Sequence, residues 1–290
     1  MIVYLNGQLL KEDDARIRAD DRGFLYADAL YESVRLYQGG FFRFEEHWQR
    51  LTLGAAALKI EAPSLEKLRA IARDVAAMNS ISDGIVRVTL TRGPGGEGLR
   101  TIGSGPPTLL VTVRSISAQR MERAEEGFKA IIANARRSPV GLPSSIKSAN
   151  RLDAILARLE ADEAAVDEAI LLSAQGYVAE GTVSNIFWRV GDQLHTPELS
   201  VGILPGVTRK AVMEVCEDLD VAVREGRWRL EELRQAHEIF FTMSSSGPVR
   251  VVELESVSLA VPDDALYPRI REAYWALVSR EAATDLATTA

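Results

Sequence analysis

The stretch from Ser144 to Asn185 constrains the fold most, because it joins a single lysine to a helical pattern and then to strand-like runs. Lys147 stands where an extended segment gives way to four apolar residues at helical spacing: Leu152, Ile155, Leu156 and Leu159. This spacing predicts an amphipathic helix that begins just after the lysine. Ser148 is the predicted N-cap of that helix.

A lysine at such a junction has two interpretations. Close to a core, desolvation lowers the pKa of a lysine amine, and a neutral amine can attack a carbonyl to form a Schiff base. A lysine before an amphipathic helix is more often a solvated surface residue. Two short apolar runs, 169–172 and 177–178, predict a hairpin that carries Glu180 to the end of a strand. The amine of Lys147 is therefore accompanied by an acid.

The composition is that of a globular protein, with enough material for one large domain or two of ordinary size. The chain has 290 residues, of which 47% are hydrophobic and 26% are charged. It contains no apolar run long enough to span a bilayer. The first ten residues lack the basic, apolar and cleavage regions of a signal peptide. We therefore expect a cytoplasmic protein without a membrane segment.

Charge and metal-binding residue types argue against two further classes. A net charge of −7 argues against general nucleic-acid binding, which needs a basic face. One cysteine and three scattered histidines offer no cluster for a metal, so we expect no metal site. Cys216 lies on the apolar side of a predicted helix, and we interpret it as a small core residue.

Residues 1–115 are typical of a small α+β domain with mostly antiparallel strands. A hairpin about Asn6-Gly7 comes first, and Ser64 is the predicted N-cap of a later helix. The predicted elements are strands at 2–5, 8–10, 30–36, 41–44, 85–91 and 109–113, and helices at 45–58 and 65–78.

Residues 116–127 show no clean periodicity and form the predicted interdomain linker. Residues 128–290 form the second predicted domain, in which the last ten residues are predicted to be loose. Besides the lysine stretch, its predicted elements are strands at 128–133, 186–190, 193–196, 221–224, 238–242 and 249–254, and helices at 207–219 and 268–279.

Two segments are suited to binding an anion. GILPGVTR at 202–209 precedes a predicted helix, whose free N–H groups and positive dipole end suit a phosphate, and Thr208 adds a hydroxyl. FFTMSSSG at 240–247 leads a strand into three serines, whose hydroxyls can bind a phosphate or a carboxylate. An ordinary loop before a helix and an ordinary serine-rich turn are the alternative interpretations.

Arginines supply further candidates. Arg50 lies on the polar side of a predicted helix, where it is either a surface residue or a phosphate ligand that uses its planar fork. The loop at 92–107 is rich in glycine and proline and contains Arg92 and Arg100. Mobile loops of this kind often gate substrates, although a tolerated insertion has the same composition.

Five motifs occur in order along nearly the whole chain: Y-x-D-x-x-Y-E-S-V-R at 26–35, H-x-x-R-L at 47–51, K-x-x-N at 147–150, E-G-x-x-S-N at 180–185 and L-P-G-V-T-R at 204–209. With these motifs the chain resembles the fold-type IV, or class IV, pyridoxal-phosphate enzymes. That family includes branched-chain aminotransferases, D-amino-acid aminotransferases and aminodeoxychorismate lyases. Each motif alone is unspecific, and their order and spacing carry the resemblance.

The resemblance implies pyridoxal 5'-phosphate as the cofactor. Lys147 would form the internal aldimine and then move the proton between the substrate Cα and the cofactor C4′. Glu180 would pair with the pyridine nitrogen, so that the ring acts as an electron sink. The other implied cofactor-binding groups are Arg50, Asn185, the backbone N–H groups of Val207 and Thr208, and the Ser244 hydroxyl.

The resemblance also implies a two-domain α/β (α+β) fold, with a small α+β domain and a larger pseudo-barrel domain that binds the cofactor. The cofactor would lie between the domains, and Tyr26 would face the substrate side. The expected assembly is a homodimer in which the partner contributes part of the substrate pocket. The expected substrates are a small amino acid and a 2-oxo acid.

Members of the family differ in the substrate pocket. D-amino-acid aminotransferases carry R-x-H soon after T-R-G at 91–93, where this chain has Glu97 and Leu99. Branched-chain enzymes show Y-x-R in the preceding strand, of which 85–87 keeps only the arginine. RGPGGEG and KSANRLD are closer to the lyases, whereas LPGVTR is closer to the aminotransferases. The candidate substrate-binding residues are therefore Tyr26, Arg87, Arg92, Arg100 and Ser245.

We therefore expect a transaminase that exchanges an amino group between an amino acid and a 2-oxo acid. The alternative is 4-amino-4-deoxychorismate lyase, which releases pyruvate and 4-aminobenzoate. Both reactions begin with removal of the Cα proton, so residues near the cofactor do not separate them. A third hypothesis is a non-catalytic binding protein that keeps the fold, and the presence of both Lys147 and Glu180 argues against it.

Overall fold

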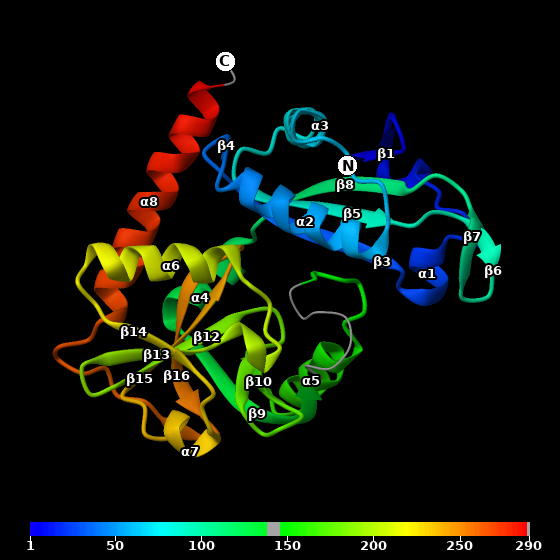
Figure 1. The fold of residues 1–290 in the computed structure, drawn as a ribbon. Helices are drawn as coiled ribbons and strands as arrows, with labels where there is room; N and C mark the ends of the chain where they lie inside the picture. The colour runs from blue at the N-terminus through cyan, green and yellow to red at the C-terminus, as the bar shows by residue number, and fades with distance from the viewer. Residues whose placement is uncertain (138–145, 289–290) are drawn as a thin grey trace. The chain divides into compact units, whose positions relative to one another are not determined.

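The computed structural model of the protein describes residues 1–137 and 146–288 (Figure 1). The described chain divides into two compact units. The first unit comprises residues 1–116, 146–150 and 278–288, and the second comprises residues 117–137 and 151–277. The lysine segment and the end of the chain, which were predicted within the second domain, thus fall in the first unit.

An antiparallel six-stranded sheet is the frame of the first unit. Its strand order is β2 (Gln8–Lys11), β1 (Ile2–Leu5), β8 (Thr108–Ser115), β5 (Gly84–Thr91), β3 (Ala29–Tyr37) and β4 (Gly40–Phe41). The predicted hairpin about Asn6-Gly7 is confirmed, and both turn residues have the positive φ that a type I′ turn requires. The strand predicted at 41–44 ends at Phe41, because a helix already begins at Phe44.

Two helices cover one face of this sheet, α2 (Phe44–Leu58) and α3 (Leu65–Met78). Ser64 caps α3 as predicted, since its side chain accepts a hydrogen bond from the Lys67 N–H. The shared core uses alternate positions of the strands, because successive strand residues face opposite sides. Among its buried members are Leu30, Val34, Val86, Val88 and Leu90.

Short elements occupy segments that were predicted as a turn and a loop. They are the 3-10 helix η1 (Glu12–Asp14), the helix α1 (Arg22–Tyr26) and the hairpin of β6 (Gly95–Glu97) and β7 (Arg100–Ser104). Asp21 begins α1 as its N-cap, since its side chain accepts a hydrogen bond from the Gly23 N–H.

A mixed nine-stranded sheet is the frame of the second unit, and β9–β10, β9–β16 and β13–β14 are its parallel pairs. Its strand order is β11 (Val178–Gly181), β10 (Glu168–Ser173), β9 (Phe128–Arg137), β16 (Gly247–Leu254), β15 (Glu238–Met243), β12 (Asn185–Val190), β13 (Gln193–Pro197) and β14 (Val223–Gly226), with β17 (Val257–Ser258) beside β16. The predicted hairpin of β10 and β11 is confirmed, and Glu180 lies near the end of β11.

Six helices accompany this sheet in the described part of the chain: α4 (Ala118–Glu126), α5 (Leu152–Glu163), η2 (Leu199–Val201), α6 (Val207–Asp218), α7 (Leu230–Leu233) and the first part of α8 (Tyr267–Ala287). The segment predicted as a linker, 116–127, contains α4, which Ser117 caps. The tail predicted to be loose is helical as far as Ala287. Among the helices in the described residues, none is long and apolar enough to cross a membrane.

The helix α5 differs from its prediction in two ways. It begins at Leu152 after Arg151, so the prediction of Ser148 as its N-cap is wrong. Its buried face consists of Ala154, Ala157 and Ala161. The four larger apolar residues whose spacing predicted the helix are 50–63% exposed: Leu152, Ile155, Leu156 and Leu159. Cys216, in contrast, is buried in α6 as predicted, and burial raises the pKa of its thiol to about 12.

Candidate active site

Lys147 belongs to a short segment that pairs with the first half of β3. The Tyr31 N–H donates to the Lys147 carbonyl at 3.0 Å, and the Ala149 N–H donates to the Ala29 carbonyl at 2.9 Å. An antiparallel bridge joins Leu30 to the residue after the lysine. The backbone on both sides of Lys147 is therefore held by the sheet of the first unit, and the lysine stands on an extended segment as predicted.

The ring of Tyr31 brings two cationic side chains together. The Lys147 Nζ lies 4.7 Å from the ring centroid, and the Arg87 guanidinium carbon lies 4.2 Å from the same centroid. Arg87 comes from β5, where it pairs in register with Ser33. Because paired residues and every second residue of a strand share a face, Tyr31 and Arg87 stand on the same side of the sheet. The Arg87 side chain is exposed there.

The opposite side of β3 carries a buried cluster of charged groups. Glu32 accepts hydrogen bonds from Arg50 Nε and Nη2, each at 2.7 Å, and its Oε2 lies 2.7 Å from His47 Nδ1. Burial by itself raises the pKa of Glu32, but Arg50 and His47 outweigh burial and hold that pKa well below its usual range. Burial lowers the pKa of His47, and Arg50 and Lys147 lower it further against the effect of Glu32. Arg50, predicted to bind phosphate, is thus oriented by Glu32.

Arg92, predicted as a substrate-binding residue, is engaged with Asp28. Its Nε and Nη2 donate to the two Asp28 carboxylate oxygens at 2.5 and 3.0 Å, and Nη2 also donates to the Leu58 carbonyl at 2.9 Å. Arg22 donates to Asp28 as well, at 3.2 Å. Burial raises the pKa of the Asp28 carboxyl, but the two arginines outweigh it and lower that pKa.

The remaining candidates for substrate binding in the first unit lie on its short elements. Tyr26 ends α1 with a half-exposed side chain, and the Arg22 guanidinium carbon lies 4.9 Å from its ring centroid. Arg100 begins β7, and its side chain is exposed. The Arg100 carbonyl accepts a hydrogen bond from Arg22 Nη1 at 3.2 Å, which ties the hairpin to α1.

In the second unit, the Glu180 carboxylate is buried and held by three partners. Its Oε2 accepts hydrogen bonds from the Leu204 N–H at 2.9 Å and from Asn185 Nδ2 at 3.3 Å. Its Oε1 lies 3.2 Å from Arg137 Nη2, and Arg137 also pairs with Asp153 at 2.8 Å. Asn185 donates in addition to the Leu204 carbonyl at 2.9 Å. The carboxylate is therefore fixed in direction on both of its oxygens.

The start of α6 stands next to this carboxylate. The N–H groups of Val207 and Thr208 lie in the first helical turn, where no earlier carbonyl of the helix can accept their hydrogen bonds. A Cβ atom on Gly206 would lie 2.0 Å from Asn185 Oδ1, so only a glycine lets Asn185 reach this place. Two N–H donors at a positive dipole end suit an anionic group.

A buried hydroxyl completes this region. Asn185 pairs in register with Thr242 of β15, so the two side chains share one face of the sheet. Thr242 is 2% exposed, and its Oγ1 has no hydrogen-bond partner among the described residues. A buried hydroxyl without a partner is costly unless a bound group supplies one. Beyond it lie Ser244 and Ser245, and Ser245 Oγ accepts a hydrogen bond from Arg120 Nη2 at 3.1 Å.

The predicted residues thus form two groups, one in each unit. In the first unit, Lys147 and Arg87 meet on Tyr31. In the second unit, Glu180 and Asn185 lie together beside the start of α6. Four contributors were not predicted from the sequence: Tyr31, Glu32, Arg137 and Thr242.

The unpredicted contributors differ in how far the sequence signals them. Tyr31 and Glu32 lie inside the motif at 26–35, and strand alternation would have placed them on opposite faces of β3. Thr242 lies inside the segment 240–247, in which only the serines were considered as anion ligands. Arg137 has no comparable signal, because it reaches the site from a strand that is distant in sequence.

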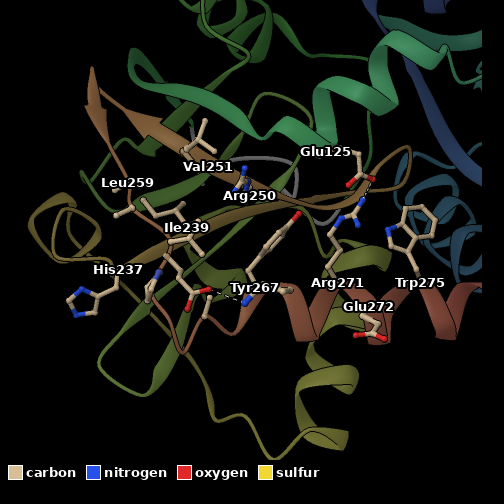
Figure 2. Close-up of a pocket in the computed structure, with 17 residues that line it drawn as sticks. Glu125, His237, Ile239, Arg250, Val251, Leu259, Tyr267, Arg271, Glu272 and Trp275 are labelled. Carbon is tan, nitrogen blue, oxygen red and sulfur yellow. Dashed lines mark hydrogen bonds and ion pairs between the residues drawn. The ribbon is translucent and has the colours of Figure 1, made fainter.

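A separate cavity of about 460 Å³ lies elsewhere in the second unit, among β15, β16 and the start of α8 (Figure 2). Polar groups at its rim are already engaged, Arg271 with the Glu125 carboxylate and Arg250 with the Glu126 carbonyl. None of the predicted site residues is among the residues that line it. Its larger apolar lining residues include Ile239, Val251, Leu259, Tyr267 and Trp275.

Comparison with known proteins shows the family of the chain. The model of the family described as amino-transferase class IV matches residues 29–254. A protein of Methanocaldococcus jannaschii named putative branched-chain-amino-acid aminotransferase is 35% identical, over 88% of each chain. An aminodeoxychorismate lyase of Bacillus subtilis is 32% identical, over 89% of this chain and 88% of its own.

A solved structure shares the fold as well. The branched-chain aminotransferase of Thermoproteus uzoniensis, crystallised with norvaline, superposes with a TM-score of 0.89 at 26% identity and covers 99% of this chain and 97% of its own. This confirms the predicted fold class, a mixed α/β enzyme of fold type IV. With the family model matching most of its length, this chain belongs to the class IV aminotransferases.

Proposed function

We propose that the protein is a pyridoxal-phosphate-dependent transaminase that exchanges an amino group between an amino acid and a 2-oxo acid. The observation that carries the proposal is the meeting of Lys147 and Arg87 on one tyrosine ring. This arrangement puts a reactive amine beside a cation that can hold a carboxylate. An amino acid and a 2-oxo acid both carry a carboxylate next to the reacting carbon.

The residues of the second unit fit the cofactor that the family uses. A phosphate needs N–H and hydroxyl donors, which the start of α6 and the β15–β16 turn present. The Thr242 hydroxyl is buried and has no hydrogen-bond partner among the described residues, so it can donate to a bound group. A protonated ring nitrogen needs a fixed acceptor, and the Glu180 carboxylate is fixed by Leu204 and Asn185. The donor set therefore suits pyridoxal phosphate.

When bound, the cofactor supplies an aldehyde for covalent attachment and a ring that accepts the electrons of the substrate Cα–H bond. In the proposal, Lys147 provides the amine for that attachment. The amino group of the incoming substrate would replace Lys147 on the aldehyde carbon, and the released Lys147 amine would then take the proton from the substrate Cα as a general base. The Lys147 carbonyl is held by the Tyr31 N–H, so the backbone of the lysine need not move while its side chain works.

Glu180 keeps a proton on the ring nitrogen in this proposal, while Arg137 and Asn185 keep Glu180 in place. The N–H groups of Val207 and Thr208 and the Ser244 hydroxyl bind the phosphate. We propose that the Arg50 guanidinium also binds this phosphate. The Glu32 carboxylate supports this role by fixing the plane of the Arg50 guanidinium.

Arg87 is the residue that we propose for the substrate carboxylate. It is exposed on the face that carries Lys147, whereas Arg92 is held by Asp28 and by the Leu58 carbonyl. Tyr26, Arg100 and Ser245 are candidates for the remainder of the substrate site. The branched-chain enzymes among the similar proteins make an aliphatic amino acid the first donor to test.

A lyase acting on 4-amino-4-deoxychorismate is the second candidate. The Bacillus subtilis enzyme of that name supports it, because its identity to this chain is close to that of the aminotransferase relative. The loop at 92–98 and the segment after Lys147 also favour it. The products of the two reactions differ, so the two proposals are separable by experiment.

The test is a half-reaction followed by the absorption of the bound cofactor. Purified protein is saturated with pyridoxal phosphate and mixed separately with L-leucine, D-alanine and 4-amino-4-deoxychorismate. We expect one amino acid to convert the cofactor to its amine form, and a 2-oxo acid to restore the original spectrum. Pyruvate release from aminodeoxychorismate without any amino-acid half-reaction would instead establish the lyase. No spectral response to any of the compounds would overturn both candidates.

We also propose that the protein is a homodimer that uses the exposed apolar stripe of α5. Large apolar side chains at positions i, i+3, i+4 and i+7 of a helix line one face, and a second copy of this chain would cover that face. The stripe consists of Leu152, Ile155, Leu156 and Leu159.

A further inference from the structure

The turn between β11 and β12 is built around the carboxylate of Glu168. Glu168 Oε1 accepts hydrogen bonds from the Thr182 N–H at 3.0 Å, from Thr182 Oγ1 at 2.5 Å and from the Ala169 N–H at 3.0 Å. Its Oε2 accepts one from Ser184 Oγ at 3.1 Å. Glu168 itself begins β10, so the carboxylate ties the turn to the neighbouring strand pair.

This turn connects two residues of the candidate site. Glu180 precedes it and Asn185 follows it, and the Gly181 N–H donates to the Ser184 carbonyl at 2.7 Å across its base. Glu168 is 1% exposed, and the hydroxyl residues that it binds, Thr182 and Ser184, are 3% and 6% exposed. The hydrogen bonds are therefore formed away from water, where losing them is most costly.

Gly181 lets the backbone of this turn approach the carboxylate closely. A Cβ atom on Gly181 would lie 2.2 Å from Ser184 Oγ and 3.0 Å from Glu168 Oε2. The backbone of the turn thus passes directly against the carboxylate. Among the described residues, no basic side chain forms an ion pair with Glu168, so neutral donors alone hold it.

We propose that Glu168 is a positioning residue that sets the place of Glu180 and Asn185 in the candidate cofactor site. This inference rests on the proposed cofactor chemistry of Glu180. Glu168 does not touch the cofactor in this proposal; it acts through the turn at 181–184. If the turn relaxes, the Glu180 carboxylate moves relative to the ring nitrogen, and a hydrogen bond weakens steeply with distance and angle.

Glu168 Oε1 accepts three hydrogen bonds and Oε2 accepts one. Two variants of Glu168 can therefore separate the loss of these hydrogen bonds from the loss of the charge. Glu168→Gln can keep its amide oxygen at the three donors of Oε1, and its NH2 group can donate to Ser184 Oγ, because a hydroxyl also accepts. Glu168→Ala loses all four hydrogen bonds. A positioning role therefore predicts rescue by glutamine and damage by alanine.

Glu238 provides a matched control. It is another buried glutamate at the start of a strand of the same sheet, and it accepts from the Leu266 and Tyr267 N–H groups at 2.9 Å each and from Arg189 at 3.0 Å. Glu238→Ala removes a similar number of hydrogen bonds outside the candidate site. It should lower the unfolding temperature without changing cofactor binding.

The experiment titrates each protein, freed of cofactor, with pyridoxal phosphate that carries ¹⁵N in its ring. It records the Kd and the ¹⁵N chemical shift of the bound ring nitrogen, which reports whether that nitrogen is protonated. Hydrogen exchange of the amides of residues 181–185 is measured without cofactor. We expect Glu168→Ala to raise the Kd about tenfold or more, to shift the ring nitrogen towards its unprotonated value and to speed exchange in the turn.

Glu168→Gln should stay within about threefold of the unmodified Kd, since it can retain its hydrogen bonds. The proposal is overturned if Glu168→Ala binds the cofactor with an unchanged Kd and ring-nitrogen shift, or if Glu238→Ala changes both equally. Equal damage by glutamine and alanine would also overturn it. If Glu168→Ala does not fold, Thr182→Val removes the 2.5 Å hydrogen bond alone and should give the same shifts at smaller size.

The result also separates this inference from the proposed function. Failure of the unmodified protein to bind pyridoxal phosphate would overturn the proposed function, and this inference with it. Normal binding by the unmodified protein together with an unaffected Glu168→Ala variant would overturn only the positioning role.

Discussion

Arg87 is the side chain through which substrate binding is most simply tested at the scale of single residues. We expect Arg87→Gln to raise the KM for amino acids by about 10- to 100-fold, because a charge-assisted hydrogen bond contributes about 1.5–3 kcal/mol. The change in kcat should be smaller, since Lys147 is untouched. Steady-state kinetics with the donor identified in the half-reaction provide the measurement.

Two further arginines serve as comparisons for that variant. Arg114→Gln alters an exposed arginine that pairs with Glu12 and should leave the KM unchanged. Arg100→Gln tests the exposed candidate on β7. A larger effect at Arg100 than at Arg87 would transfer the carboxylate-binding role to β7 and contradict our assignment.

The cluster of Glu32, His47 and Arg50 predicts how stability depends on pH. The pKa of His47 lies below its usual 6.5, so the unfolded chain takes up this proton first and stability is lost as pH falls through that range. The pKa of Glu32 lies below its usual 4.5, so its contribution is present above pH 4.5 and is lost below it. Both effects favour the folded state at neutral pH.

We expect Glu32→Gln to lower the free energy of unfolding by about 3–5 kcal/mol at pH 7.5, because it leaves the buried Arg50 without its carboxylate partner. The loss of stability below pH 4.5 should be smaller in the variant. Urea unfolding between about pH 2.5 and pH 8 checks both. Glu12→Gln, which removes an exposed ion pair with Arg114, should change stability by less than about 1 kcal/mol. Equal stability of Glu32→Gln and the unmodified protein would contradict the account.

At the scale of elements, α5 carries the prediction about assembly. Light scattering should give twice the chain mass of 31.8 kDa, and Leu156→Glu should shift the protein towards one chain mass, because a charge in an apolar interface is costly. Leu53→Glu places the same change on an exposed leucine of α2 and should leave the mass unchanged. A dimer that persists in Leu156→Glu would show that the interface lies elsewhere.

The elements that were predicted correctly are those that neighbouring residues in the sequence stabilise. The hairpin about Asn6-Gly7 and the helix capped by Ser64 depend on turn residues and a side-chain cap, both of which are visible in the sequence. The spacing of the large apolar residues predicted the helix α5, but small alanines share its helical period and form its buried face. Its strand neighbours accept only Ala154, Ala157 and Ala161. Period alone does not tell which of two apolar faces the sheet will cover.

The candidate site shows the same difference between local signals and contacts that depend on the fold. Lys147 and Glu180 could be named from local patterns and motif order, whereas their partners arise from pairing between distant strands. Arg137 reaches Glu180 from β9, and Glu168 holds the turn at 181–184 from β10. Such contacts depend on sheet topology, which strand patterns do not specify.

At the scale of the whole molecule, the chain assigns the two halves of the proposed chemistry to different compact units. The amine and the proposed carboxylate cation belong to the first unit, although Lys147 comes after all the described strands of that unit and after α4 and β9 of the second. The ring-nitrogen acid and the anion-binding helix start belong to the second unit. A single boundary at 116–127 would therefore place the lysine segment in the second unit, whereas it belongs to the first.

The proposed function depends most on Lys147, which would carry the cofactor covalently. The most direct measurement saturates the protein with pyridoxal phosphate, reduces it with borohydride and maps the modified peptide by mass spectrometry. We predict one reduced cofactor per chain, on Lys147, in the unmodified protein and in Lys67→Ala, which alters an exposed lysine of α3. Lys147→Ala should lose the adduct and at least about 10²- to 10⁴-fold in turnover. An adduct on another lysine, or full turnover in Lys147→Ala, would contradict the account.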